Sequence, residues 1–135
     1  MPKIRCKLSF SPFEATRKTL EGLIAHKLEV GVLDDGLAEI AAYQEFGTST
    51  IPARPFLHEP VSAEVDTIHD TLHTAALKGQ PAEGAFQEVA YHCEAVVDRQ
   101  FATEGEGRWD TRQDDSDKPL LGSLRAAVSS RISKR

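Results

Sequence analysis

The sequence predicts an α+β domain in which a small, mostly antiparallel sheet packs against helices, including a helical hairpin in the C-terminal half. Three observations support this fold class. Segments near the start, in the first third and at the end of the chain alternate apolar and polar residues, as strands with one buried face do. Longer segments between them carry apolar residues at helical spacing. A chain of 135 residues is the size of one domain, so we expect residues 1–135 to form a single unit.

The first expected elements are a strand and a helix. Residues 3–10 alternate basic or hydroxyl side chains with apolar ones, which predicts a strand. The tetrapeptide Ser11-Pro12-Phe13-Glu14 then offers an N-cap serine, a proline at the first helical position and a glutamate that can complete a capping box. The helix should continue to about His26. Its apolar stripe, the side that an amphipathic helix turns to the core, consists of Phe13, Leu20, Leu23 and Ile24.

A second strand and a short element follow. Residues 27–33 alternate again and predict a strand that stops at the turn signal Asp34-Asp35-Gly36. Residues 37–46 are typical of a short helix or of an irregular apolar turn. Gly47 is a suitable residue to end this element, because glycine adopts the backbone conformation that closes a helix.

Two longer helices are expected next. Apolar residues at helical spacing predict one helix from Val61 to about Lys78, and Pro81 can open another that runs to about Gln100. The apolar stripe of the second helix includes Phe86, Val89, Cys93, Val96 and Val97. Because only a few residues join the two helices, we expect them to pack antiparallel as a hairpin.

The character of the chain changes between about residues 103 and 118. This segment is rich in glycine and charge, with Trp109 as its apolar anchor, and it predicts a mobile loop that becomes ordered in an assembly. The candidate residues of such an assembly arm are Arg108, Trp109, Asp110 and Arg112. Residues 119–125 then predict a single helical turn, and residues 126–132 predict a last strand.

Composition excludes some classes of function. The formal net charge of -5 argues against general nucleic-acid binding through a basic surface. The N-terminus lacks the apolar region of a signal peptide and no segment has the length of a membrane span, so we expect a protein made and kept in the cytoplasm. Cys6 and Cys93 lie far apart in apolar patterns and predict reduced core thiols.

Few residues suggest catalysis. His69 and His73 are four apart on a predicted helix, a spacing that can place two imidazoles on one metal ion, but no specific third ligand accompanies them. Cys93, beside His92, lies on an apolar stripe where a thiol is inert. We therefore predict no catalytic residue, no metal site and no cofactor. A small metal-dependent hydrolase that uses His69 and His73 stays a distant alternative.

The most particular stretch is QEFGTSTIPARPFL, residues 44–57. Pro52 and Pro55 each fix one backbone angle and favour extended conformations in the residues before them, so the peptide between them loses little entropy when held rigid. Gly47 permits a turn that a side chain would hinder. The composition therefore predicts a loop that holds one shape.

The ends of this loop carry apolar anchors. We expect Phe46, Phe56 and Leu57 to fix both ends to the core, with Arg54 projected toward a carboxylate or a carbonyl oxygen. Two alternatives stay open for Arg54: it ties the loop to its own domain, for example to Glu45, or it contacts a neighbouring subunit.

The same stretch resembles a loop of the tailed-bacteriophage tail-completion or neck (virion morphogenesis) family. In that family an apolar helix ends at Glu-Phe-Gly-Thr, here residues 45–48, and Pro-Ala-Arg-Pro-Phe-Leu follows, here residues 52–57. Residues 118–125, Lys-Pro-Leu-Leu-Gly-Ser-Leu-Arg, resemble the family's C-terminal element that leads into a final strand. The strand at residues 30–33 is similar as well.

This resemblance implies a structural virion protein and not an enzyme. Members of the family act in the neck or tail, where the capsid meets the tail, as rings of identical copies, commonly six-fold. The implied partners are other copies of the chain and the neighbouring neck, tail-terminator or tail-tube proteins, with assembly in the host cytoplasm. A tail terminator, a head-side connector ring and a host-encoded interaction module are the alternatives. The implied interface residues are those of the loop and its flanks: Glu45, Phe46, Gly47, Pro52, Arg54, Pro55, Phe56 and Leu57.

Overall fold

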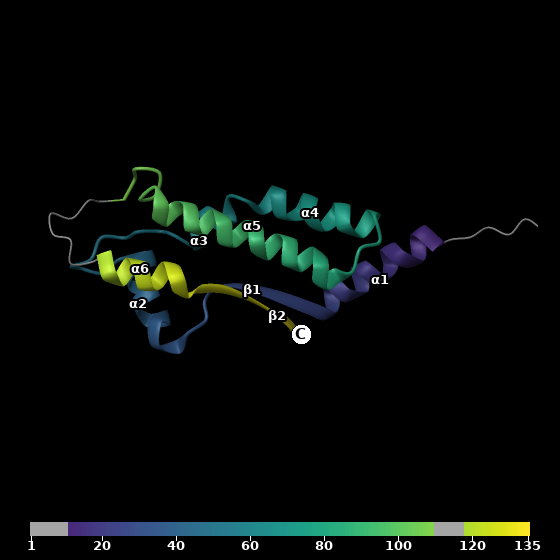
Figure 1. Cartoon of the computed structure of the whole chain (residues 1–135), viewed down its shortest axis with the longest axis horizontal. Coiled ribbons are helices and arrows are strands. Elements are labelled where there is room, and N and C mark those ends of the chain that lie inside the picture. Colours follow the sequence, from purple (N-terminus) through teal and green to yellow (C-terminus); the bar gives the residue numbers. More distant parts are fainter. Residues whose placement is uncertain (1–10, 110–117) are drawn as a thin grey trace, which may run out of the picture.

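The computed structural model describes residues 11–109 and 118–135 and confirms an α+β fold. A two-stranded antiparallel sheet is combined with helices, and the molecule is elongated (Figure 1). The expected first strand, residues 3–10, lies outside the described residues. The elements in chain order are α1 (Ser11–Ala25), β1 (His26–Val32), α2 (Asp35–Phe46), α3 (His58–Ser62), α4 (Val65–Leu77), α5 (Ala82–Ala102), α6 (Lys118–Ala127) and β2 (Val128–Lys134).

The sheet joins the first third of the chain to its end. β1 and β2 run antiparallel, with Leu28 opposite Ile132 and Val32 opposite Val128. These residues share one face because side chains alternate along a strand. Val32 and Val128 pack against the core that α5 helps to form, which places this apolar face toward the helices. Figure 1 shows the sheet and α4 on opposite sides of α5.

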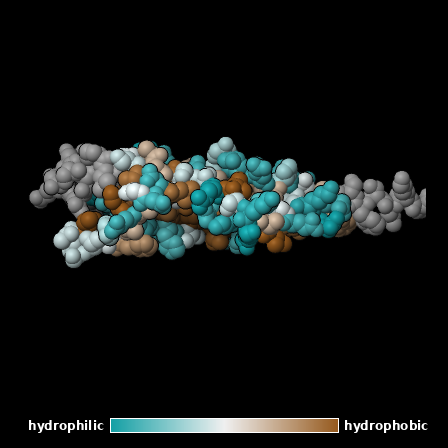
Figure 2. All heavy atoms as spheres, turned by 90° about the horizontal axis from the view of Figure 1, so that it is seen from below, coloured by the Kyte–Doolittle hydropathy of each residue, from teal (hydrophilic) through white to brown (hydrophobic). Residues whose placement is uncertain are grey.

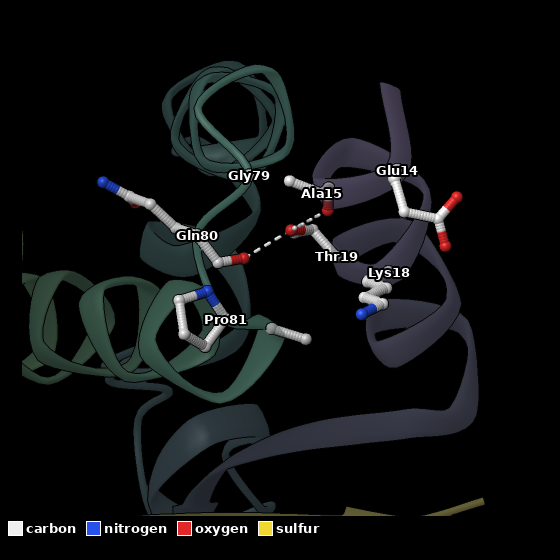
Figure 3. A pocket seen from close by; sticks show the side chains of 8 residues that line it. Glu14, Ala15, Lys18, Thr19, Gly79, Gln80 and Pro81 are labelled. Atoms are coloured by element: carbon white, nitrogen blue, oxygen red, sulfur yellow. Dashed lines mark hydrogen bonds between the residues drawn. The ribbon is translucent and has the colours of Figure 1, made fainter. Parts of the chain in front are cut away.

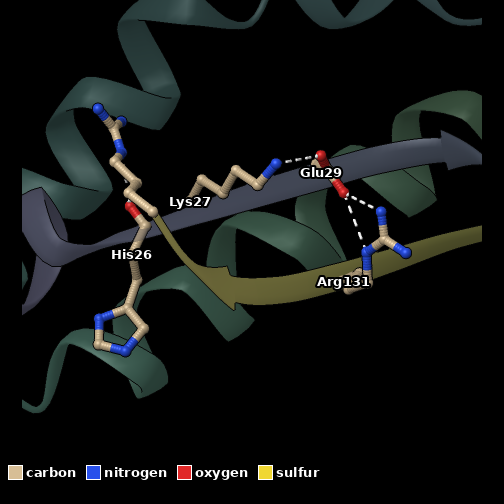
Figure 4. A network of polar contacts seen from close by, with 5 residues as sticks. His26, Lys27, Glu29 and Arg131 are labelled. Carbon is tan, nitrogen blue, oxygen red and sulfur yellow. Dashed lines mark hydrogen bonds and ion pairs between the residues drawn. The ribbon is translucent and has the colours of Figure 1, made fainter.

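The other face of the sheet is polar. Glu29 of β1 lies opposite Arg131 of β2, and the Arg131 guanidinium donates to the Glu29 carboxylate (Nε to Oε2, 3.0 Å). Lys27 donates to the second oxygen of the same carboxylate at 2.8 Å (Figure 4). The hydrogen bonds from Lys27 and Arg131 hold the pKa of Glu29 below its usual value.

The predicted helical hairpin is confirmed by α4 and α5, which lie side by side in Figure 1. The single helix expected from Val61 to Lys78 is wrong in one respect, since it is divided into α3 and α4. The backbone N–H of Glu64 donates to the Val61 carbonyl three residues earlier, which tightens the chain between the two helices. The Glu64 side chain then pairs with His92 of α5 (Oε2 to Nε2, 2.8 Å).

The main core cluster lies where α2, α5, α6 and the loop before α3 meet. Its buried members are Ala41, Phe56, Val97, Trp109 and Leu124. The Phe101 ring stands 5.1 Å from that of Phe56 and 5.7 Å, edge to face, from that of Trp109, measured between ring centroids. Aromatic rings at such separations attract one another beyond their burial.

Trp109 therefore belongs to the core, and residues 103–109, the described part of the expected loop, form hydrogen-bonded turns. The backbone N–H of Trp109 donates to the Glu104 carbonyl at 3.1 Å, and that of Gly105 donates to the Gln100 carbonyl at 2.8 Å. At Gly105, where φ is +67°, a β-carbon would lie 2.3 Å from the indole ring. Glycine is needed there because the ring occupies the space of a side chain.

Helix α1 packs in an unexpected orientation. Its small residues Ala15, Thr19 and Gly22 face the turn between α4 and α5, where an added β-carbon on Gly22 would lie 2.6 Å from that of Ala82. Figure 3 shows the Thr19 hydroxyl between the carbonyl oxygens of Ala15 and Gln80. A shallow hollow of about 400 Å³ lies along this contact.

Most of the apolar stripe of α1 is consequently exposed. Phe13 is 72% exposed, Ile24 71% and Leu20 46%, so the expectation that the stripe faces the core is wrong for these three residues, whereas Leu23 is half-buried. The physical reason is close approach: only the small side of α1 lets its backbone come near the turn at Gly79, where an added β-carbon would lie 2.4 Å from that of Ala15.

The remaining boundaries differ modestly from the expected ones. The Asp34 side chain accepts from the Gly36 N–H at 2.8 Å, so the turn signal is the N-cap of α2. Residues 37–46 belong to this helix, which resolves the alternative of an irregular turn. The single turn expected at residues 119–125 is the ten-residue helix α6, and the last strand starts two residues later than predicted.

Candidate functional site

The candidate site is the loop between α2 and α3, and Glu45 organises it. The Glu45 side chain is 8% exposed and its carboxylate accepts three backbone hydrogen bonds. Oε2 accepts from the N–H groups of Phe56 at 2.9 Å and Leu57 at 3.0 Å, and Oε1 accepts from that of His58 at 2.8 Å. Since the N-cap residue Leu57 has no capping side chain, a carboxylate from the end of α2 caps α3.

Gly47 starts the loop in a conformation that favours glycine. Its φ is 75° and ψ 169°, and its N–H donates to the Tyr43 carbonyl at 2.9 Å. A β-carbon there would lie 2.8 Å from the Ala53 nitrogen and 3.0 Å from the Ile51 oxygen. The loop therefore returns so closely over residue 47 that no side chain fits.

A narrow turn follows Gly47. The Thr48 N–H donates to the Ile51 carbonyl at 2.8 Å, and the Thr48 hydroxyl accepts from the Ile51 N–H at 3.0 Å. The Arg54 N–H then donates to the Gln44 carbonyl at 2.6 Å. Hydrogen bonds thus join the two halves of the loop to each other and to the end of α2.

Replacing Gly47 with alanine should lower the free energy of unfolding by about 1–3 kcal/mol, because of the positive φ and the contact with Ala53. Urea denaturation would measure the change. Gly84 in α5 is the matched control: a β-carbon there meets nothing within 4 Å, so Gly84→Ala should be neutral or stabilising by about 0.5–1 kcal/mol. Equal effects of the two substitutions would show that the turn at Gly47 is not constrained.

The apolar anchors of the loop are only partly as expected. Phe56 is buried in the core cluster, and Leu57 is half-buried against it. Pro52 and Pro55 are half-buried as well. Phe46 is 73% exposed, so the prediction that it fixes the loop to the core is wrong. It is the last residue of α2 and points outward because Glu45, its neighbour, takes the inward position.

Arg54 is a buried residue of the loop. Its side chain is 5% exposed and does not extend into solvent. The short hydrogen bond from its backbone to Gln44 draws this part of the loop onto α2. Burial within one chain favours the alternative in which Arg54 ties the loop to its own domain.

The other candidates do not join this site. His69 and His73 are both exposed on α4, and residues 11–109 and 118–135 contain no group of three or more potential metal-ligating side chains. Cys93 is buried, and desolvation raises the pKa of its thiol, as its apolar position predicted.

The residues of the proposed assembly arm differ in burial. Arg108 is exposed and its Nε donates to the Gly105 carbonyl at 3.1 Å, whereas Trp109 is a core residue. Asp110 and Arg112 lie outside the described residues. Deleting residues 104–117 to test assembly would remove the buried indole of Trp109 and disturb folding itself.

Glu45 was expected in this loop from the sequence, but its role as the cap of α3 was not predicted. A negative charge in the last turn of a helix is unfavourable, because that end of the helix dipole is itself negative. The position of Glu45 just before Phe46 and Gly47 was therefore a signal that its carboxylate has a specific role. The exposed apolar stripe of α1 was missed too, although the spacing of Ala15, Thr19 and Gly22 on one side of the helix was visible.

None of the helices in the described part of the chain combines the length and apolar character that crossing a membrane requires. Comparison of the chain with models of protein families, with curated proteins and with solved structures found no match.

Proposed function

We propose that this protein is a structural, non-enzymatic component of the neck of a tailed bacteriophage, where a ring of identical copies, commonly six-fold in the family it resembles, joins the head to the tail. The proposal rests on the resemblance of residues 45–57 and 118–125 to the tail-completion or neck family. A tail terminator and a head-side connector ring are related roles for the same kind of ring.

One observation supports the proposal most. The two segments that carry the resemblance are far apart in the sequence and meet in one core cluster, through the fully buried side chains of Phe56 and Leu124. Their place in the same cluster makes the loop and the C-terminal element parts of one structural unit.

The distribution of exposed apolar residues also fits a ring. Such a ring needs two different, complementary patches on each copy. α1, with Phe13, Leu20 and Ile24 exposed, and α2, with Tyr43 and Phe46 exposed, lie at opposite ends of the molecule (Figure 1). Figure 2 shows hydrophobic residues at the surface among hydrophilic ones. The exposed apolar residues of α1 and α2 supply candidate contacts for these two patches.

A phage that lacks a functional copy of this gene tests the proposal. We expect unjoined heads and tails in the lysate, visible by electron microscopy, and rescue of infectivity by the wild-type protein. Phe46→Ser should reduce rescue by about tenfold or more, because Phe46 is exposed and its loss costs an interface anchor and little folding stability.

Tyr91→Ser is the matched control, since Tyr91 is 64% exposed on α5, outside both patches. It should rescue like the wild type. Normal virions in the absence of the protein would refute the neck role.

A further inference from the structure

The two strands carry a local excess of positive charge. Residues 26–32 and 128–135 contain one acidic side chain, Glu29, and four basic ones: Lys27, Arg131, Lys134 and Arg135. Four positive charges less one negative charge leave these segments strongly basic, in a chain whose formal net charge is -5. A ligand that approaches a surface responds to the local potential, which the net charge of the whole chain does not describe.

Three of the four cations lie on the polar face of the sheet. Side chains alternate along a strand, so Arg131 and Arg135 share the face of Glu29. The Arg135 N–H donates to the Ala25 carbonyl at 3.0 Å, which continues the ladder one step beyond β2. Lys27 joins them, because its register partner lies midway between the two arginines. The three exposed cations therefore follow one another at steps of two residues, about 6.6 Å along the sheet.

Glu29 neutralises this group only in part. Its carboxylate accepts from both the Lys27 ammonium and the Arg131 guanidinium, so two cations share one anion (Figure 4). Arg131 uses Nε and Nη2 for this contact, which leaves Nη1 for a ligand. The Arg135 Nε donates to the His26 carbonyl at 3.0 Å, and this neutral acceptor leaves the charge of Arg135 uncancelled.

The chemistry of the polar face suits a phosphate backbone. Its members are cationic, hydroxyl-bearing or glycine, apart from one carboxylate: Lys27, Glu29, Gly31, Ser129, Arg131, Ser133 and Arg135. Leu57 lies over Gly31 at one end, and the cations occupy the rest. Arg, Lys and Ser side chains are the usual donors to phosphate oxygens.

The same composition disfavours other ligands. Protein interfaces depend on aromatic and apolar anchors, and none of the side chains of this face is of that kind. Proteins that bind single-stranded nucleic acid stack its bases on aromatic side chains, which this face also lacks. A duplex presents its phosphates without exposing base faces, so it needs cations and hydroxyl groups alone.

We propose that the polar face of the sheet binds the phosphate backbone of duplex nucleic acid, independently of base sequence. Lys27, Arg131 and Arg135 each contact a phosphate group. The proposal goes beyond the neck role and does not rest on it, because these three residues lie outside residues 45–57 and 118–125, which carry the family resemblance. Three phosphate contacts in each copy give weak binding that salt reduces.

The first test measures salt dependence. The full-length protein is added to a fluorescently labelled DNA duplex of arbitrary sequence, and anisotropy gives the binding constant at several salt concentrations. We expect a slope of log K against log salt of about -2 to -3 for each bound copy, as three phosphate contacts require. A wild type that does not bind at the lowest salt concentration, or a slope near zero, would overturn the proposal.

A charge-matched pair of variants tests the location. Arg131→Gln/Arg135→Gln should bind about tenfold or more weakly, with a slope shallower by about 1.8. Lys18→Gln/Lys78→Gln removes the same amount of charge from exposed lysines of α1 and the end of α4, so it should bind like the wild type. Equal losses of affinity in the two variants would show that the sheet is not the site.

Glu29→Gln should change affinity in the opposite direction. It removes the carboxylate that Lys27 and Arg131 share, so duplex binding should become about twofold or more tighter. Loss of surface ion pairs costs little stability, and circular dichroism would check the fold. This gain does not depend on whether the double arginine variant folds. Weaker binding by Glu29→Gln would contradict the proposal.

Competition identifies the class of ligand. Unlabelled duplex should displace the labelled duplex better than polyglutamate or a single-stranded oligonucleotide does, at equal concentrations of negative charge. Stronger competition by polyglutamate would assign the face to an acidic protein partner, and stronger competition by the single strand would exclude the duplex as its ligand. Either outcome would overturn the proposal.

These measurements need no phage, which separates the two proposals. Duplex binding by a protein whose loss leaves heads joined to tails would refute the neck role alone. Head–tail joining that depends on a protein without affinity for duplex would refute the binding face alone.

Discussion

Phe56→Ala should lower the free energy of unfolding by about 3–5 kcal/mol. Phe56 is 1% exposed and belongs to the core cluster, with its ring 5.1 Å from that of Phe101. Removing the ring leaves a cavity between α2, α5 and α6, and a core that already holds Trp109 and Leu124 cannot easily close it. Chemical denaturation at neutral pH would measure the loss.

Phe46→Ala is the control for this substitution. Phe46 is the same residue type at the other end of the same loop, but it is 73% exposed. Its removal should change stability by less than about 0.5 kcal/mol. If the two variants unfolded at the same denaturant concentration, the placement of Phe56 in the core would be wrong.

Glu45→Gln should destabilise the fold by about 2–4 kcal/mol. Glutamine keeps one side-chain oxygen but has an NH2 group in place of the other. That group is a donor, so it cannot accept the hydrogen bonds that backbone N–H groups now donate to the Glu45 carboxylate. Hydrogen bonds to a charged acceptor are stronger than neutral ones, so the remaining bonds weaken too. Urea denaturation gives the free energy, and hydrogen exchange at Phe56, Leu57 and His58 gives the local effect.

Glu59→Gln provides the comparison. Glu59 lies on α3 beside the same loop and is exposed, so the loss of its charge should leave stability nearly unchanged. We expect the amides of residues 56–58 to exchange faster in Glu45→Gln only. Unchanged protection of these amides would mean that the carboxylate does not hold the loop.

The proposed assembly adds an expectation for the Glu45 substitution. Phe46 is exposed at one end of the loop and Phe56 is buried at the other. The Glu45 carboxylate joins the two ends through its hydrogen bond from the Phe56 N–H. A loop that is rigid before binding loses little entropy when a neighbouring subunit contacts it. Loosening the loop through Glu45 should therefore weaken any contact made by the tip of α2.

Local chemistry made several elements predictable. Asp34 and Gly47 define the ends of α2, and the alternation of residues 27–33 identifies β1, because capping and the period of a strand depend on neighbours in the sequence. The helical hairpin was predictable for the same reason, since a short connection after Lys78 requires two adjacent helices.

Contacts between distant segments were not predictable. Trp109 lies in a glycine-rich, charged segment whose sequence suggests mobility. Only the packing of its ring on Phe101, which in turn packs on Phe56, shows that it is a core residue. Arg54 is of a residue type that is rarely buried, and its burial follows from the path of the loop back to Gln44. In each case the deciding partner lies many residues away or on another element.

The sequence by itself determined the α+β class and the order of the described elements, apart from the division of one expected helix into α3 and α4. These properties follow from propensities, caps and periodicity, which act over a few residues. The tertiary structure alone decided that Glu45 caps α3, that the two segments of the resemblance meet at Phe56 and Leu124, and that α1 turns its small side inward. The reason is that packing selects, among the faces a helix offers, the one whose shape fits its neighbour, and hydrophobicity alone does not reveal that shape.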